Sequence, residues 1–210
     1  MTVNGWPMIH CRLHISGRKG HTMKVRRVTT GHNALGTAMV AGDTEVDGAT
    51  LALLPGAEFH RLWGADRPPN FPDGGAQPEG PGYFPPLGGF RFMMFTVAPH
   101  TMSRRAAVDR HALLAEMEAK LPGLASHMEP NNPGMHTTDT IDFEYIISGE
   151  VWLDLDDGAS VHLGAGDTVV QNGTRHRWRN EGVEPCRIVV FLVGTRRTPS
   201  GIEVARASVV

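Results

Sequence analysis

Residues 166–180 read GDTVVQNGTRHRWRN, and this stretch decides the fold of the C-terminal half of the chain. A turn at Gly166 opens it, and a second turn at Asn172-Gly173 separates an apolar segment from a basic one. Both segments are too short for a helix and have the length of a β-strand. The stretch therefore predicts two strands joined by a turn.

The same alternation of short strands and turns continues on both sides of this stretch. From residue 141 onward the chain contains no helix-length interval, and Asp156-Asp157-Gly158 is a strong hairpin signal. Many short strands with closely spaced turns are typical of an all-β sandwich or barrel. We therefore predict an all-β fold.

The N-terminal half is predicted to add strands and one helix. Short apolar segments between residues 23 and 100 read as strands, and residues 90–97 (FRFMMFTV) are the clearest of these. Residues 64–89 are dominated by Gly and Pro, which predicts a long loop that is either a lid or a mobile surface segment. Residues 105–120 have apolar side chains at helical spacing and are followed by Leu-Pro-Gly, so we predict one helix there.

Composition and charge limit the domain organisation and the partners. With 210 residues, of which 40% are hydrophobic, we expect a single domain over residues 23–210 after a loosely ordered extension, residues 1–22. A formal charge of −2 argues against a nucleic-acid footprint, and no apolar run approaches the roughly 20 residues of a membrane helix. Two cysteines, Cys11 and Cys186, fit a reducing cytosol. We expect a cytoplasmic protein that binds a small molecule.

The basic segment divides into two faces if it is extended. Side chains alternate with period two, so the arginines share one face (Arg175, Arg177 and Arg179). Three adjacent arginines cannot share a dry core unpaired, so we interpret their face as solvated. His176 and Trp178 are then predicted to point inward.

The same alternation predicts a second inward polar set on the strand that precedes Gly149. One parity carries His136, Thr138, Asp142, Glu144 and Ile146. Two buried carboxylates are costly without partners, so either a cation compensates them or one is protonated or exposed. The two strands together predict a polar cluster inside a β-barrel.

These residues resemble the cupin family, whose fold is a double-stranded β-helix, or jelly-roll barrel. The second cupin motif is Gly, five residues, Pro-x-Gly, two residues, His, three residues, Asn. Gly166, Gly173, His176 and Asn180 follow it, with the first gap one residue shorter and Gln171 where proline is usual. The resemblance implies a cupin core over residues 133–196, which the N-terminal strands extend.

The first cupin motif is less complete. It reads Gly, five residues, His-x-His, three or four residues, Glu, six residues, Gly. Counting back from Gly149 places Asp142 at the position of the glutamate, His136 at the first histidine and Thr138 at the second.

Cupins typically bind a divalent metal through three histidines and a glutamate. The resemblance therefore implies a metal at His136, Asp142 and His176, and iron, zinc, manganese and nickel all suit such ligands. Glu144 is the alternative carboxylate ligand. Another interpretation is that the loss of the second histidine marks a barrel without metal, in which a His–carboxylate pair does acid–base chemistry alone.

The function that the resemblance implies is a metal-dependent lyase or isomerase acting on a small oxygenated or carboxylated organic molecule. Decarboxylation, dehydration or enolisation would use the metal as a Lewis acid, Glu144 as general base and Trp178 as an apolar wall. A non-haem Fe(II) dioxygenase on the same two-His-one-carboxylate set is the first alternative, and a non-catalytic ligand-binding cupin is the second. The family also implies a homodimer.

Overall fold

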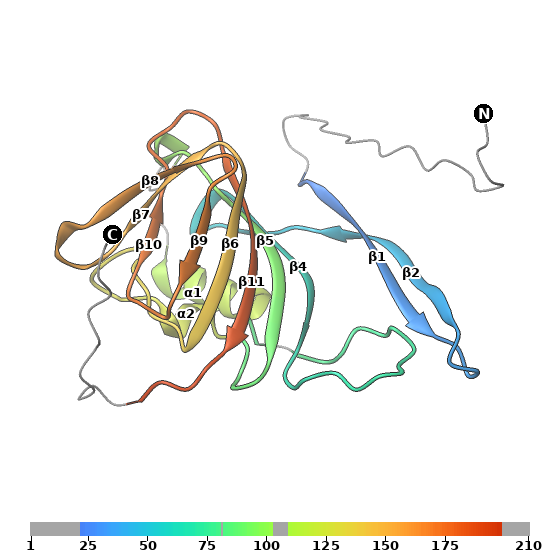
Figure 1. Cartoon of the computed structure of the whole chain (residues 1–210). Coiled ribbons are helices and arrows are strands. Elements are labelled where there is room, and N and C mark those ends of the chain that lie inside the picture. Colours follow the sequence, from blue (N-terminus) through green and yellow to red (C-terminus); the bar gives the residue numbers. More distant parts are fainter. Residues whose placement is uncertain (1–21, 81, 103–108, 199–210) are drawn as a thin grey trace, which may run out of the picture.

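The described part of the chain, residues 22–80, 82–102 and 109–198 of a computed structural model, forms three antiparallel β-sheets (Figure 1). The largest has the strand order β3 (Ala49–Leu51), β4 (Leu54–Ala65), β5 (Phe90–Val97), β11 (Cys186–Gly194), β6 (Thr140–Ser148) and β9 (Thr168–Gln171). The second has the order β10 (Arg177–Arg179), β7 (Glu150–Asp154) and β8 (Ser160–Gly164). The third is the hairpin of β1 (Lys24–His32) and β2 (Ala38–Asp47). The predicted all-β fold is confirmed.

Within the described ranges two helices accompany the sheets, α1 (Arg110–Lys120) and α2 (Leu124–His127). The helix predicted near residues 105–120 is confirmed from Arg110 onward, whereas residues 103–108 lie outside the described residues. Asp109 caps α1, because its side chain accepts a hydrogen bond from the backbone N–H of His111 at 2.9 Å. Single 3-10 turns lie at His100–Met102 and Asp156–Gly158.

Two apolar clusters fill the space on the inner face of the six-stranded sheet. One joins this sheet to the three-stranded sheet and consists of Ile146, Val151, Leu153, Leu163, Cys186 and Ile188. The other packs the two helices against the sheet and consists of Leu51, Tyr83, Met93, Met117, Leu121, Leu124, Val190 and Leu192. The three-stranded sheet and the two helices therefore together cover one face of the six-stranded sheet.

The loop between β4 and β5 differs from its predicted form. It begins at residue 66 rather than 64, because Gly64 and Ala65 still belong to β4. Phe71 is exposed, but Tyr83 is buried in the cluster that holds the helices. The end of this loop is therefore part of the core, and the interpretation as a surface segment holds only for its beginning.

The β1–β2 hairpin lies beside the barrel as a projecting arm (Figure 1). Ion pairs between its strands, Lys24 with Glu45 and Arg26 with Asp43, lie on its exposed side. Arg27 fastens the arm to the barrel by donating to the carbonyl oxygen of Leu62 at 2.9 Å. Most of the predicted N-terminal extension, residues 1–21, lies outside the described residues.

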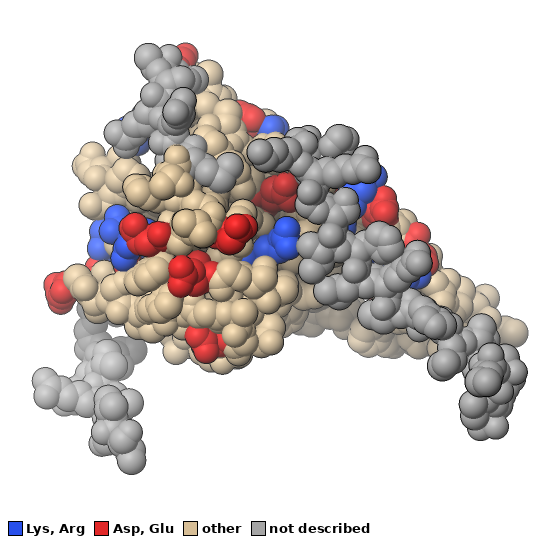
Figure 2. Space-filling view, turned by 90° about the horizontal axis from the view of Figure 1, so that it is seen from above, with Lys and Arg blue, Asp and Glu red and all other residues tan. Residues whose placement is uncertain are grey.

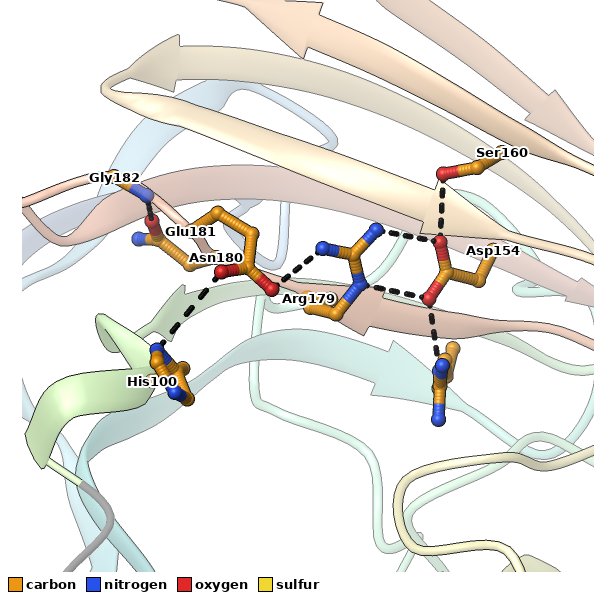
Figure 3. A network of polar contacts seen from close by, with 8 residues as sticks. His100, Asp154, Ser160, Arg179, Asn180, Glu181 and Gly182 are labelled. Atoms are coloured by element: carbon orange, nitrogen blue, oxygen red, sulfur yellow. Dashed lines mark hydrogen bonds and ion pairs between the residues drawn. The ribbon is translucent and has the colours of Figure 1, made fainter.

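The arginine face of the basic segment is partly solvated, and its side chains are also ion-paired, which the sequence-based interpretation did not include. Arg177 donates to Asp154 on the neighbouring strand β7. Arg179 donates to the same carboxylate and also to Glu181 (Figure 3). Arg175 donates to Glu129 and Asp156. Acidic and basic side chains also lie side by side on the face of the molecule seen in Figure 2.

Replacing Asp154 by asparagine is expected to lower the free energy of unfolding by about 2–3 kcal/mol, because hydrogen bonds to charged groups stabilise more than neutral ones. The carboxylate accepts from Arg177, Arg179 and Ser160, and these bonds hold its pKa well below the usual range. Urea unfolding measures the effect. Asp157→Asn, in the exposed turn next to β7, is the matched control; equal stability of the two variants would contradict the expectation.

Candidate functional site

Strand β6 presents alternate residues to the barrel interior, as the period-two pattern predicts. Four alternate residues are buried: Thr140, Asp142, Glu144 and Ile146. The residues between them are exposed on the outer face of the sheet: Phe143, Tyr145 and Ile147. The predicted inward set on this strand therefore lies inside.

The two inward carboxyl groups of β6 have apolar neighbours on β11, whereas on the other side Asp142 is opposite Gln171 of β9. Asp142 is opposite Leu192 of β11, and Glu144 is opposite Val190. Within the described residues, Oδ1 of Asp142 and Oε2 of Glu144 are buried and have no hydrogen-bond partner. A buried acceptor without a partner costs free energy, most of all when its group is ionised. Both oxygens are thus available to a ligand or a proton.

Burial shifts both carboxyl groups toward the protonated form. It raises the pKa of Asp142 to about 6, although Thr140 opposes the shift through a hydrogen bond. Burial also raises the pKa of Glu144 well above its usual value, and the charge of Asp142 raises it further. Burial thus favours the protonated form of both carboxyl groups, and Asp142 titrates near pH 6.

Tyr83 and Arg61 complete the surroundings of this pair, and neither was predicted from the sequence. Burial raises the pKa of Tyr83, Asp142 raises it further and Arg61 lowers it, so the phenol lies among these charges. Arg61 is half-buried on β4 and donates to the carbonyl oxygens of Gly80 and Gly82 at 2.6 and 3.2 Å. Burial and the neighbouring Arg91 lower the pKa of Arg61. The Gly/Pro-rich loop has no helical or strand periodicity in its sequence, so the inward position of Tyr83 could not be predicted.

The two predicted histidines meet at one end of the interior. Their backbones exchange hydrogen bonds of 2.9 and 3.0 Å, and the ring centroids of His136 and His176 are 4.2 Å apart. Each ring places Nδ1 against a backbone carbonyl oxygen, at Gly134 and Thr174 respectively, which leaves both Nε2 atoms free of these contacts. Trp178 lies edge-on to His176 with ring centroids 6.2 Å apart. His176 and Trp178 both point toward the interior, as predicted from the sequence.

Both imidazoles are neutral at pH 7. Burial lowers the pKa of His136, and burial followed by the neighbouring His136 lowers the pKa of His176 to about 4. Neutral imidazoles are the form that binds a metal or accepts a proton.

The predicted metal ligands come together only in part. Among the residues that the structure describes, no three His, Cys, Asp or Glu side chains form a group that could hold a metal ion. Thr138, at the position of the second family histidine, is fully buried and its hydroxyl is 2.8 Å from that of Thr140. His136 and His176 form one pair, Asp142 and Glu144 another. The donor set does not fit a three-ligand centre, and the assignment of His136, Asp142 and His176 as ligands stays a prediction.

Other residues of the two sequence motifs shape the barrel. The Asn180 side chain donates to the carbonyl oxygens of Val97 and Glu184, both at 2.9 Å, and so ties the end of β10 to β5. Gly149 has φ +78° in the turn after β6, where a side chain would also meet the carbonyl oxygen of Pro185 at 2.7 Å. Asn180 and Gly149 therefore have structural roles in the motifs, in a side-chain contact to the backbone and in a turn, and no chemical role.

Two facing antiparallel sheets with a polar interior define a small jelly-roll barrel. Residues 126–192 match the family Cupin_2, described as "Cupin domain". Residues 126–192 thus form a cupin domain, and the resemblance seen in the two motifs is confirmed. No helix in the described ranges has the length and apolar character needed to cross a membrane.

Relatives with curated names come from fungal biosynthesis clusters. The chain is 50% identical over 58 residues to Phomopsin biosynthesis cluster proteins C' and D of Diaporthe leptostromiformis, a match that covers 28% of this chain and 31% of each relative. It is 44% identical over 48 residues to Oryzines biosynthesis cluster protein J of Aspergillus oryzae, which covers 23% of this chain and 27% of that protein. The matches thus span less than a third of the curated relatives.

Solved structures that are similar to the chain are remote. A Cupin 2 conserved barrel domain protein from Salinispora arenicola is 16% identical with a TM-score of 0.34, covering 69% of this chain and 81% of that one. The Cupin_2 domain of an XRE family transcriptional regulator from Enterobacter cloacae is 17% identical with a TM-score of 0.32, covering 51% and 83%. These values carry no information about function.

Proposed function

We propose that this chain is a biosynthetic cupin enzyme of the lyase or isomerase type, acting on a small oxygenated or carboxylated organic molecule. The names of its relatives, proteins of phomopsin and oryzines biosynthesis clusters, support a role in the synthesis of small molecules. Enolisation, dehydration and decarboxylation all need a proton to be moved within a water-poor site.

One observation carries the proposal: two adjacent carboxyl groups inside the barrel each have a buried oxygen without a partner in the described residues. A pair of carboxyl groups with separated pKa values can divide acid and base roles. Asp142 ionises nearer neutrality and acts as the base, whereas Glu144 keeps its proton and acts as the acid. Trp178 forms an apolar wall of the interior beside His176.

The divalent metal expected from the sequence stays a prediction in this proposal. Its predicted ligands, His136, Asp142 and His176, do not form one group in the described residues, so the acid and base steps are assigned to the carboxyl pair alone. Elemental analysis of protein purified without chelator decides the point. Stoichiometric zinc, nickel or manganese would support the metal-assisted form, and stoichiometric iron would favour the dioxygenase alternative. The homodimer and the cytoplasmic location also stay predictions. Measuring the mass of the protein in solution would test the homodimer.

The proposal predicts proton exchange in substrates that carry an acidic C–H bond. Incubation with a panel of 2-oxo and 3-hydroxy acids in deuterated buffer, followed by proton NMR, is expected to show loss of a C–H signal or loss of water or carbon dioxide. Glu144→Gln is expected to slow this by about 100-fold or more, as for removal of a general acid. Glu184→Gln, at an exposed position, is the control. Equal rates for Glu144→Gln and the wild type would refute the role of Glu144.

A further inference from the structure

A cavity opens where the end of β11 meets the second half of the loop between β4 and β5. Its volume is about 590 Å³, which lies within the range of roughly 300–1,000 Å³ typical of small-molecule sites. One wall is apolar and consists of Phe84, Pro85, Pro86 and Leu87. The rest of the lining is mainly polar and includes Thr140, Thr195, Arg196, Arg197, His127 and Arg91.

Backbone hydrogen bonds fix the apolar wall to the sheet. The backbone N–H of Gly88 donates to Gly194, and the N–H of Gly194 donates to Gly89, at 3.1 and 2.9 Å. The ring of Phe84 also packs against that of His127 with centroids 4.5 Å apart. The cavity is therefore held open by the fold itself, and a ligand would not have to order this wall.

Among the residues that the structure describes, one of the three arginines that line the cavity has no carboxylate partner. Arg91 pairs with Asp66, and Arg197 pairs with Asp139, each at 2.5 Å. Arg196 lines the same cavity, and among the described residues no carboxylate lies within ion-pair distance of it. The lining thus carries three arginines against two aspartates, an excess of one positive charge that an anionic ligand would neutralise.

The cavity also leads toward the carboxyl pair of the candidate site. Thr140 belongs to its lining and lies two residues before Asp142 on β6. The two sites are neighbours along β6, one residue pair apart.

We propose that this cavity binds the carboxylate end of a small organic acid through Arg196, with the apolar body of the acid against residues 84–87. The proposal deepens the proposed function and rests on it only for the chemistry that follows binding. It assigns to Arg196 the selection of carboxylates over neutral analogues. Arginine suits this task because its planar fork matches a carboxylate.

Binding of phenylacetate and of its neutral amide, phenylacetamide, tests the proposal by NMR titration. The wild type is expected to bind phenylacetate more tightly than the amide, with shift changes at the backbone amides of Phe84, Thr140 and Thr195. Arg196→Gln is expected to weaken phenylacetate binding about tenfold, which corresponds to the loss of about 1.4 kcal/mol, and to leave the amide unchanged. Arg196→Lys should retain part of the preference.

Arg187→Gln is the matched control, because Arg187 lies on β11, the strand that precedes Arg196, at the end farthest from the cavity. Equal affinity for acid and amide, unchanged phenylacetate binding by Arg196→Gln, or shift changes elsewhere on the protein would each overturn the proposal. Glu144→Gln separates it from the proposed function. If this variant binds phenylacetate normally and the wild type has no lyase or isomerase activity, the function fails while the anion site stands.

Discussion

The free energy of unfolding of Asp142→Asn, minus that of the wild type, is expected to increase by about 3 kcal/mol as the pH is raised from 4 to 7. Burial raises the pKa of Asp142 from 3.8 to about 6, so the folded state holds its proton more tightly than the unfolded state. Its contribution to stability is complete below pH 4 and is lost as the pH rises through 6. About two pKa units correspond to about 3 kcal/mol.

The comparison with the wild type is essential, because His176 titrates in the same range with the opposite sign. Burial lowers its pKa to about 4, so folding is penalised below pH 6 and the penalty disappears as the pH rises. The two slopes oppose each other in the wild type. The difference between the variant and the wild type removes the histidine contribution.

Urea unfolding at several pH values measures this difference. Asp47→Asn, an exposed aspartate on the hairpin, is the control and is expected to leave the difference near zero across the range. A stability difference for Asp142→Asn that does not change with pH would show that the carboxyl group is ionised in the folded state throughout, and the acid–base assignment would lose its support.

The alternation of side chains along the strands could be predicted from the sequence, residue by residue. The reason is physical: a strand with one buried face repeats with period two, and a slip by one residue would bury Phe143 and expose Glu144. The inward positions of Asp142, Glu144 and His176 followed from this rule. The rule needs no knowledge of which strands are neighbours.

What the sequence could not predict depends on pairing between distant segments. The arginines were interpreted as solvated because their partner Asp154 belongs to another strand, and only the register of β10 with β7 brings Arg177 opposite it. Tyr83 comes from a loop without a period, and its burial depends on the helices that pack over the sheet. The local pattern predicts the face of the sheet to which a side chain points. Which residues meet in a site depends on which strands pair in three dimensions.

Replacing Gly194 by alanine is expected to lower the free energy of unfolding by about 3 kcal/mol or more, because the added methyl group would overlap a backbone carbonyl. A Cβ atom at this position, the end of β11, would collide with the carbonyl group of Pro86. Backbone cannot move aside as a flexible side chain can, so residues 85–89 must shift. The same shift would deform the apolar wall of the cavity and weaken phenylacetate binding.

Thermal unfolding measures the change, which is expected to lower the Tm by about 10 °C for a chain of this size. Gly164→Ala is the matched control: Gly164 also ends a strand, β8, and no atom lies within 4 Å of the position its Cβ would take. It is expected to change stability by no more than about 0.5 kcal/mol. Similar melting temperatures for the two variants would mean that residues 85–89 adjust without cost, and the fixed wall inferred for the cavity would then be wrong.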